Sequence, residues 1–213
     1  MNEAMPELTP LPRSFYCSAA DVVASRLLGH WLIRVTSAGV VGGPIVETEA
    51  YLHDDPACHA FRGVTPRNGV MFGPPGHSYV YFIYGVHYCV NAVCQPVGCG
   101  EAVLIRAVEA TFGSDQLRRC RSVNGLQSLT NGPAKLCQAM AIGRALNGVD
   151  LCDRRSPLYI AQNPQWAKFR AERAPLITTT RVGITRGADL PLRFYLSGSE
   201  FISRRGLAAK WIP

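Results

Sequence analysis

Apolar and polar positions alternate in short runs along this chain, which is the pattern of β-strands more than of long helices. Strands are predicted at 30–35, 40–48, 79–84, 86–93, 102–108, 158–160, 177–185 and 192–196. Helical spacing is confined to three stretches, at 18–29, 111–121 and 131–142. The mixture predicts a mixed α/β (α+β) domain built on a curved, mostly antiparallel sheet that is flanked by helices.

The predicted helices carry recognisable end signals. Ser18 is placed to cap the first helix, and Gly29 is placed to end it. Pro133 suits the first turn of the third helix, where a missing N–H costs nothing. Residues 125–130 and 163–173 are polar without a clear period, so we expect irregular structure there.

The run from 79 to 93 predicts a β-hairpin, because two alternating strands flank the pair Tyr84–Gly85. Tyr81 and Tyr84 fall on opposite faces of the first strand. A hairpin within the core would carry Val or Ile beside its turn. We therefore expect Tyr84 to be an exposed side chain that inserts into a partner.

Composition limits the class of protein. The chain has 213 residues, 47% hydrophobic and 17% charged, which is enough for one well-cored domain and too apolar for a disordered chain. Only three of the 22 basic residues are lysines, and the net charge is +7. Arginine favours bidentate phosphate contacts, so a polyanionic partner fits, as does a merely solvated Arg-rich surface.

Neither end of the chain predicts a membrane segment. No apolar run approaches the ~20 residues that span a bilayer, and the opening residues are polar and proline-rich. We expect a flexible tail at 1–12, a single domain at 13–213, and a soluble intracellular protein.

The eight cysteines are predicted to be free, mostly buried thiols. Cys89, Cys94 and Cys99 are five residues apart and form no Cys-x-x-Cys pair, and the first two would face opposite sides of a strand. His30, His53, His77 and His87 show no metal-ligand spacing either. We expect no metal.

Two acids on one predicted strand are unusual. Glu47, Glu49 and Tyr51 share a face of that strand. The conservative interpretation is an edge strand whose acidic face meets solvent. Against it, several polar and aromatic residues come from elements expected to lie nearby, namely His59, Tyr81, Asn91 and Arg106.

A carboxylate in an aromatic pocket can act as a general base on water. Only Glu49 is well placed, so a glycosidase with paired carboxylates is disfavoured. Displacement of a good leaving group at an anomeric carbon needs only the base and stabilisation of the positive charge that develops. Arg106 either pairs with Glu47 or Glu101, or contacts a phosphate or the water.

The chain resembles the alkyladenine (3-methyladenine, methylpurine) DNA glycosylase family over about residues 11–201. The resemblance is carried in order by Val46-Glu-Thr-Glu-Ala-Tyr51, Ala57-Cys-His59, Thr65-Pro-Arg-Asn68, Tyr79-Val-Tyr-Phe-Ile-Tyr-Gly85, Asn91, Val103-Leu-Ile-Arg-Ala107, Gly132-Pro-Ala-Lys-Leu-Cys-Gln-Ala139 and Leu192-Arg-Phe-Tyr195. No single motif would suffice, but their order and spacing together are specific.

The resemblance implies a catalytic group. Glu49 matches the general base that deprotonates the attacking water. Arg106 and the backbone carbonyl of Val182 match groups that hold this water. The flipped base would be sandwiched by the side chains at three further positions, Tyr51, His59 and Tyr81.

The resemblance also implies contacts to DNA. Tyr84 matches the hairpin residue that fills the gap left in the duplex, and Asn91 matches the residue that excludes guanine by crowding its 2-amino group. Lys135 at a helix start, and Arg67 in the Thr65–Asn68 turn, match DNA contacts. Extrusion is needed because the glycosidic bond is out of reach inside the base stack.

The implied activity is that of a monofunctional DNA glycosylase without cofactor or metal. It would excise alkylated or deaminated purines, of the 3-methyladenine type, from duplex DNA and so start base excision repair. We expect duplex DNA with damaged purines as the partner, a monomer with no obligate protein partner, and no membrane. A bacterial-type member would be cytoplasmic and nucleoid-associated.

Three departures from the family stand out. Residues 51–55 replace a Gly-Pro-Glu-Asp-like turn, Val64 stands where relatives often carry a basic residue, and 147–176 has no recognisable anchor. Two other classes of protein stay open. An inert nucleic-acid binder explains the charge and Tyr84, and a small-molecule hydrolase, such as a nucleoside hydrolase, explains Glu49 and the aromatic residues.

Overall fold

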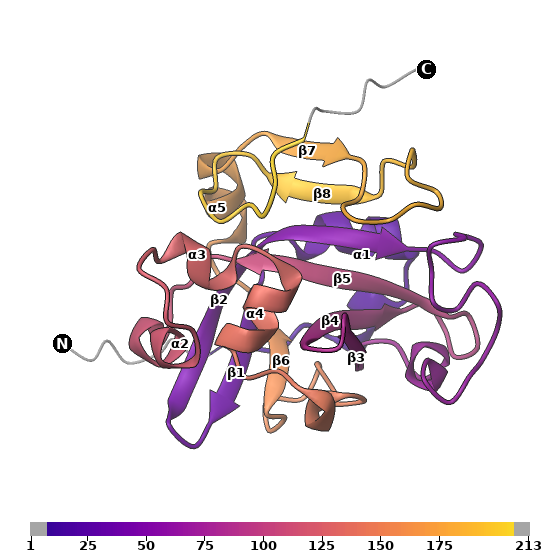
Figure 1. Ribbon diagram of the computed structural model, residues 1–213, viewed down its shortest axis with the longest axis horizontal. Coiled ribbons are helices and arrows are strands. Elements are labelled where there is room, and N and C mark those ends of the chain that lie inside the picture. The colour runs from indigo at the N-terminus through magenta and orange to yellow at the C-terminus, as the bar shows by residue number, and fades with distance from the viewer. Residues whose placement is uncertain (1–7, 207–213) are drawn as a thin grey trace.

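Eight antiparallel strands form one curled sheet in the computed structural model, which describes residues 8–206 (Figure 1). The strands are β1 (Trp31–Thr36), β2 (Gly39–Tyr51), β3 (Ser78–Ile83), β4 (His87–Cys94), β5 (Glu101–Val108), β6 (Leu158–Ala161), β7 (Leu176–Thr179) and β8 (Arg193–Leu196). The helices are α1 (Ala20–Leu27), α2 (Ser114–Cys120), α3 (Gln127–Thr130), α4 (Pro133–Ala139) and α5 (Trp166–Glu172), with short 3-10 turns η1 (Arg13–Tyr16), η2 (Gly69–Phe72) and η3 (Arg144–Leu146).

The long strand β2 organises the sheet. The strand order is β3-β4-β5-β2-β1-β6, and β8 also pairs with β2 and carries β7 at its outer side. The first half of β2 pairs with β1, and its second half lies between β5 and β8, with an irregular register around Glu47. Gly43 lets β2 approach the backbone that follows β5, because a Cβ at this position would lie 1.6 Å from the carbonyl oxygen of Glu109.

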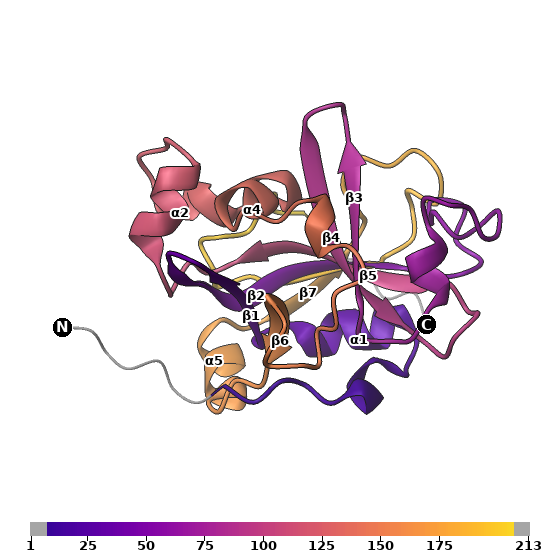
Figure 2. The ribbon, with the colours of Figure 1, turned by 90° about the horizontal axis from the view of Figure 1, so that it is seen from below.

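The central strands have two distinct faces. Side chains at Ala50, Val80, Val90, Val103 and Ile105 enter the main hydrophobic core, which includes α1. Because side chains alternate along a strand, the residues between these positions point to the opposite side of the sheet. Figure 2 shows α4 on that opposite side and α1 beneath β2 and β5.

The hairpin of β3 and β4 projects from the body of the molecule (Figure 2). Its strands pair from Ser78–Ala92 to Ile83–His87, so the turn has three residues, Tyr84 to Val86. Tyr84 and Gly85 both have positive φ, 52° and 69°. The hairpin was predicted correctly, except that Tyr84 belongs to the turn and not to the first strand.

Several local predictions were wrong. Ser18 does not cap α1, whose N-cap is Ala19 without a side-chain hydrogen bond. The stretches expected to be irregular contain α3 and α5. The strand predicted at 177–185 ends at Thr179, because the following residues turn toward β2 and bond to its side chains.

The N-terminal segment is more ordered than expected. Residues 8–12 were assigned to a flexible tail, but Leu8 and Leu11 are buried and the Leu11 N–H donates to the carbonyl oxygen of Ile160. The remainder of that predicted tail, 1–7, lies outside the described residues. All eight cysteines are free, and in the part of the chain from 8 to 206 no helix is long and apolar enough to cross a membrane.

Candidate active site

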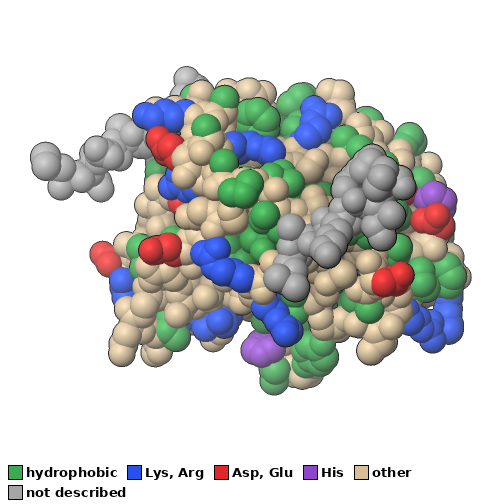
Figure 3. All heavy atoms as spheres, turned by 90° about the horizontal axis from the view of Figure 1, so that it is seen from above, with side chains coloured by type: hydrophobic (Ala, Val, Ile, Leu, Met, Phe, Trp, Pro, Cys, Tyr) green, Lys and Arg blue, Asp and Glu red, His purple; other side chains and the backbone are tan. Residues whose placement is uncertain are grey.

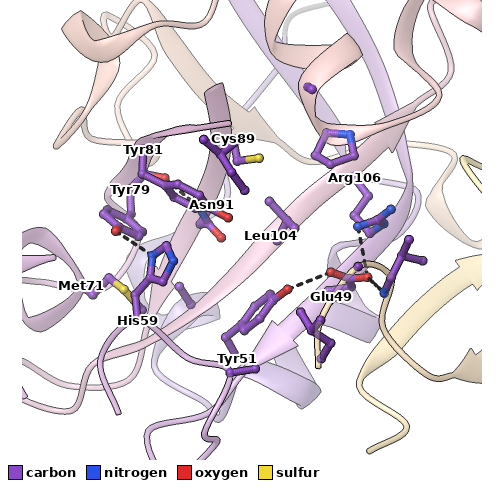
Figure 4. Close-up of a pocket in the computed structure, with 18 of the residues that line it drawn as sticks. Glu49, Tyr51, His59, Met71, Tyr79, Tyr81, Cys89, Asn91, Leu104 and Arg106 are labelled. Carbon is purple, nitrogen blue, oxygen red and sulfur yellow. Dashed lines mark hydrogen bonds and ion pairs between the residues drawn. The ribbon is translucent and has the colours of Figure 1, made fainter. Parts of the chain in front are cut away.

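A cavity of about 320 Å³ lies over the non-core face of β2, β3, β4 and β5 (Figure 4). Each strand contributes alternate residues, as its period of two requires. The start of α4 and the loop after β7 close the remaining sides. The lining comprises Glu49, Tyr51, Ala57, His59, Met71, Tyr79, Tyr81, Ile83, Tyr84, Cys89, Asn91, Ala102, Leu104, Arg106, Pro133, Ala134, Val182, Gly183 and Ile184.

Glu49 is fully buried, yet its carboxylate is well satisfied. Its Oε1 accepts a hydrogen bond from the Val182 N–H at 2.8 Å and lies 3.1 Å from Arg106 Nη1. Its Oε2 accepts a hydrogen bond from the Tyr51 hydroxyl at 3.0 Å. Three donors therefore surround this one buried carboxylate in an otherwise aromatic cavity.

Arg106 joins this carboxylate to a second buried acid. Its Nε donates to Glu47 Oε1 at 2.9 Å, while its Nη1 faces Glu49. Burial lowers the pKa of Arg106, but the charges of Glu49 and Glu47 outweigh that effect and raise it. Glu47 also accepts from Arg193 at 3.0 Å and from the Ser203 N–H at 2.7 Å. Two acids and two arginines thus balance each other behind the cavity.

Glu47 does not line the cavity, although it shares the strand with Glu49. The two carboxylates contact the same guanidinium, Glu47 at Nε and Glu49 at Nη1 of Arg106. Glu47 forms an ion pair with Arg106 and holds its guanidinium in place. This ion pair is one of the alternatives that the sequence left open for Arg106. Glu101, the other partner considered for Arg106, bonds to His53 instead.

A buried ion pair places the loop that carries Val182. The guanidinium of Arg181 bonds to both carboxylate oxygens of Asp55, and its Nη1 donates to the Ala50 carbonyl at 3.0 Å. The same guanidinium lies over the ring of Tyr51, 4.7 Å from the centroid. These contacts fix the Tyr51 ring and present the neighbouring Val182 N–H to Glu49.

Aromatic side chains form two opposing walls (Figure 4). Tyr51 stands on one side, and His59 and Tyr81 stand on the other, with their ring centroids 4.5 Å apart. His59 Nδ1 pairs with the Tyr79 hydroxyl at 2.9 Å. Burial, and then the charge of Arg67, lower the pKa of His59, so the imidazole is neutral at pH 7. The gap between the walls suits a flat aromatic ring.

The end of the cavity is rigid. Asn91 is 4% exposed, and its side-chain amide donates to the Tyr79 carbonyl at 2.9 Å, which fixes the orientation of the amide. Asn68 donates to the carbonyl of His59 at 2.7 Å and so secures the loop that carries the imidazole. Burial raises the pKa of the Tyr79 hydroxyl to about 12 and that of the Tyr81 hydroxyl further.

The rim carries the exposed residues predicted from sequence. Tyr84 lines the cavity edge and is 79% exposed. Arg67 and Lys135 are exposed and are absent from the cavity lining; Arg67 donates to the Phe82 carbonyl, and Lys135 Nζ donates to Asn131. Figure 3 shows Lys and Arg side chains spread over one face of the molecule, with hydrophobic side chains between them.

The cavity thus unites most of the residues singled out from sequence. Glu49, Tyr51, His59, Tyr81, Asn91, Arg106, Val182 and Tyr84 all line it. Sequence reasoning missed Cys89 and Leu104, although each lies two residues before a predicted site residue on the same strand face. It also missed Pro133 and Ala134, because nothing local indicates that the start of α4 faces the cavity.

The fold and cavity define an enzyme with a buried carboxylate at the end of a slot for a flat ring, beside a projecting hairpin. The sequence model described as methylpurine-DNA glycosylase (MPG) matches residues 14–200. This protein belongs to the methylpurine-DNA glycosylase family. It is therefore a DNA glycosylase, a DNA-repair hydrolase of N-glycosyl bonds.

Close relatives agree with this assignment. Proteins of Methanoculleus marisnigri and Carboxydothermus hydrogenoformans are 50% and 48% identical, each over 92% of this chain and 99% of the relative. A Nitrobacter winogradskyi protein is 45% identical over 92% of this chain and 88% of its own length. All three carry the name "Putative 3-methyladenine DNA glycosylase".

Proposed function

We propose that this glycosylase flips a damaged purine, of the 3-methyladenine type, out of duplex DNA and hydrolyses its N-glycosidic bond with a water activated by Glu49. The observation that carries the proposal is the buried Glu49 carboxylate at the end of an aromatic slot, held by two hydrogen bonds and an ion pair. Related proteins named for 3-methyladenine support the choice of substrate.

The two oxygens of Glu49 have different roles in the proposal. Oε1 is occupied by Val182 and Arg106, whereas among the described residues Oε2 accepts only from Tyr51. Oε2 therefore has the acceptor capacity to take a proton from water. The water oxygen bonds to C1′, the bond from C1′ to the base nitrogen breaks, and its electron pair leaves with the base. The carboxylate also stabilises the oxocarbenium-like charge that develops on the sugar.

The slot favours bases that need no protonation before they leave. His59 is neutral at pH 7, and the pKa values of the Tyr51 and Tyr81 hydroxyls are raised, so these groups are poor proton donors to a leaving base. A cationic alkylated purine departs as a neutral base, and its charge is attracted to aromatic faces. Alkylated purines should therefore be cut faster than neutral deaminated purines such as hypoxanthine.

Asn91 is the selectivity gate of the proposal. Its amide is fixed by the Tyr79 carbonyl and cannot swing aside without loss of that hydrogen bond. A purine with a 2-amino group would crowd it, which excludes guanine. Within the same proposal, Arg106 orients the attacking water and the Val182 carbonyl contacts that water. The Val182 N–H donates to the Glu49 carboxylate and holds it in place.

The hairpin supplies the contact with DNA. Tyr84 is exposed at the cavity rim, where it can occupy the gap left by the flipped nucleotide. Arg67 and Lys135 would neutralise phosphates on either side. We propose a monomer that acts on chromosomal DNA without a cofactor; in a bacterium it would be cytoplasmic and nucleoid-associated.

A panel of duplexes tests this function, each with one damaged purine, together with the matching free nucleosides. We expect abasic sites from duplexes that contain 3-methyladenine, which has no 2-amino group, and no release from nucleosides. Binding without abasic sites would identify an inert nucleic-acid binder. Release from the free nucleosides would identify a nucleoside hydrolase. Either result would overturn the proposal.

A further inference from the structure

We propose a transition-metal site, selective for Zn²⁺ or a metal of similar softness, that is formed by His53, Cys99 and Glu101. A donor atom from each of these residues lies within 4.8 Å of the other two. The site is separate from the cavity, because Ala102 lines the cavity and Glu101, its neighbour on β5, points to the other face. It goes beyond the proposed function, which needs no metal.

The carboxylate of Glu101 is the fixed ligand of this set. Its side chain is 3% exposed, and Oε2 accepts a hydrogen bond from the Ala20 N–H at 2.9 Å. Its Oε1 faces His53 Nδ1 at 2.9 Å. A buried acid held by one oxygen presents the other in a defined direction, which a metal site requires.

The backbone between Cys99 and Glu101 directs both side chains to one place. Gly100 has a φ of 76°, and a Cβ there would lie 2.8 Å from the side chains of Ala60 and Phe72. Only glycine fits this turn, so the short Cys-Gly-Glu segment is held rigidly. The Gly100 carbonyl also accepts a weak hydrogen bond from the Cys58 thiol.

His53 completes the set from a different segment, two residues after β2 ends. Its side chain is 61% exposed, so the imidazole can adjust and replace its hydrogen bond to Glu101 with a shared metal ion. One sulfur, one imidazole nitrogen and one carboxylate oxygen match the ligands of Zn²⁺, with water as a fourth ligand. Cys99 would bind as the thiolate and release its proton to solvent.

A metal here would cross-link the loop that follows Tyr51 to the start of β5. That loop also carries Asp55, which pairs with Arg181, and His59, whose ring forms part of one wall of the cavity. Binding would therefore stabilise the cavity-forming loop without entry of the ion into the cavity. The effect is measurable in the absence of DNA.

Titration of the metal-free protein with Co²⁺ tests the site, because thiolate-bound Co²⁺ has a near-ultraviolet charge-transfer band. We expect one equivalent to produce the band and Zn²⁺ to displace it. Cys99→Ser should abolish the band, and His53→Ala should weaken Co²⁺ binding at least tenfold. Cys120→Ser removes a similarly half-buried thiol on α2 and should leave the titration unchanged.

Thermal unfolding with and without Zn²⁺ gives a second measurement. Zn²⁺ should raise the melting temperature of the wild-type protein but not that of His53→Ala, whose exposed side chain can be removed without loss of folding. No one-to-one Co²⁺ binding, or an unchanged band in Cys99→Ser, would overturn the proposal. Neither measurement involves base excision, so this site and the proposed function can fail separately.

Discussion

The hydroxyl of Tyr51 donates a hydrogen bond to Glu49 Oε2 across 3.0 Å. A wall of the cavity and its buried acid are therefore one unit, and a base that stacks on Tyr51 lies directly beside the carboxylate. Arg181 supports the ring of Tyr51 from behind at 4.7 Å. In the proposed function, this hydrogen bond joins the side chain that stacks on the base to the carboxylate that activates the water.

Glu49→Gln should abolish excision and preserve binding to lesion DNA. The amide keeps the shape of the side chain but cannot take the proton from water, a loss of roughly 10²- to 10⁴-fold in single-turnover rate. Abasic-site formation measures the rate, and a gel-shift titration measures binding. Glu172→Gln removes an exposed acid of the same type and should keep full activity. Near-normal turnover of Glu49→Gln would remove Glu49 as the base.

Tyr84→Ala should weaken retention of the flipped base. The exposed phenol replaces the lost stacking, and aromatic stacking on a base contributes about 1–3 kcal/mol, so we expect roughly 10- to 100-fold weaker lesion binding. Fluorescence of 2-aminopurine beside the lesion reports flipping. Tyr84→Phe keeps the ring and should behave as wild type. Equal binding and equal single-turnover rates for the alanine variant would refute the wedge.

Asn91→Ser should relax the exclusion of guanine. The smaller side chain leaves room for a 2-amino group, and we expect guanine excision to rise roughly tenfold while 3-methyladenine is still cut. Prolonged incubation with undamaged duplex, followed by abasic-site cleavage, measures this change. Asn147→Ser, which alters an amide outside the cavity that accepts from the Val80 N–H, serves as the matched control. Unchanged purine selectivity would contradict the gate.

Breaking the Asp55–Arg181 pair should lower stability and activity together. Both side chains are at most 1% exposed, so removal of one leaves a buried charge without its partner at a cost of about 3–5 kcal/mol. Asp55→Asn and Arg181→Met should each lower the melting temperature by roughly 10 °C. The double variant should lose less than the sum of the two, as thermal unfolding will show. Additive losses would mean that the residues act independently.

Acid should destabilise the protein through His30. Its Nδ1 accepts the Asn163 N–H, and burial, followed by the charges of Arg170 and Arg26, lowers its pKa from 6.5 to about 4. Above pH 6.5 the folded and unfolded states are both neutral at this residue. As the pH falls from 6.5 to about 4, only the unfolded state gains the proton, so the free energy of unfolding falls by about 3 kcal/mol.

Denaturant unfolding between pH 7 and pH 4 checks this prediction. His30→Gln should be less stable at pH 7 and show a flatter pH dependence, because the titrating group is gone. His87→Gln alters a histidine on the projecting hairpin and should keep the wild-type slope. An unchanged slope in His30→Gln would assign the acid sensitivity to other groups.

Alternation along the chain predicted most of the strands and much of the cavity lining. The period of two places Glu49 and Tyr51 on one face, and the same rule puts Asn91 and Arg106 on matching faces of β4 and β5. Tyr84 was correctly expected to be exposed, since a bulky aromatic residue beside a turn has few neighbours to cover it.

Other features depend on contacts between distant segments, which no local pattern encodes. The strand expected through 185 ends early because Arg181 pairs with Asp55 and Val182 turns to Glu49. Leu8 and Leu11 lie in a polar, proline-rich stretch, yet Leu11 joins the main core and Leu8 packs in a second cluster with residues of β1 and β6. His53 and Cys99 are far apart in sequence and meet only because β2 and β5 are neighbours.

The hydrogen bond from Val182 to Glu49 joins residues 133 positions apart. The strands β2, β3, β4 and β5 all lie within the first 110 residues, whereas Val182 lies in the loop after β7. Glu49 therefore has all three of its contacts only when that late segment is docked against β2. A chain that ended before the loop after β7 would therefore contain every residue of the two aromatic walls and still leave Glu49 without this contact.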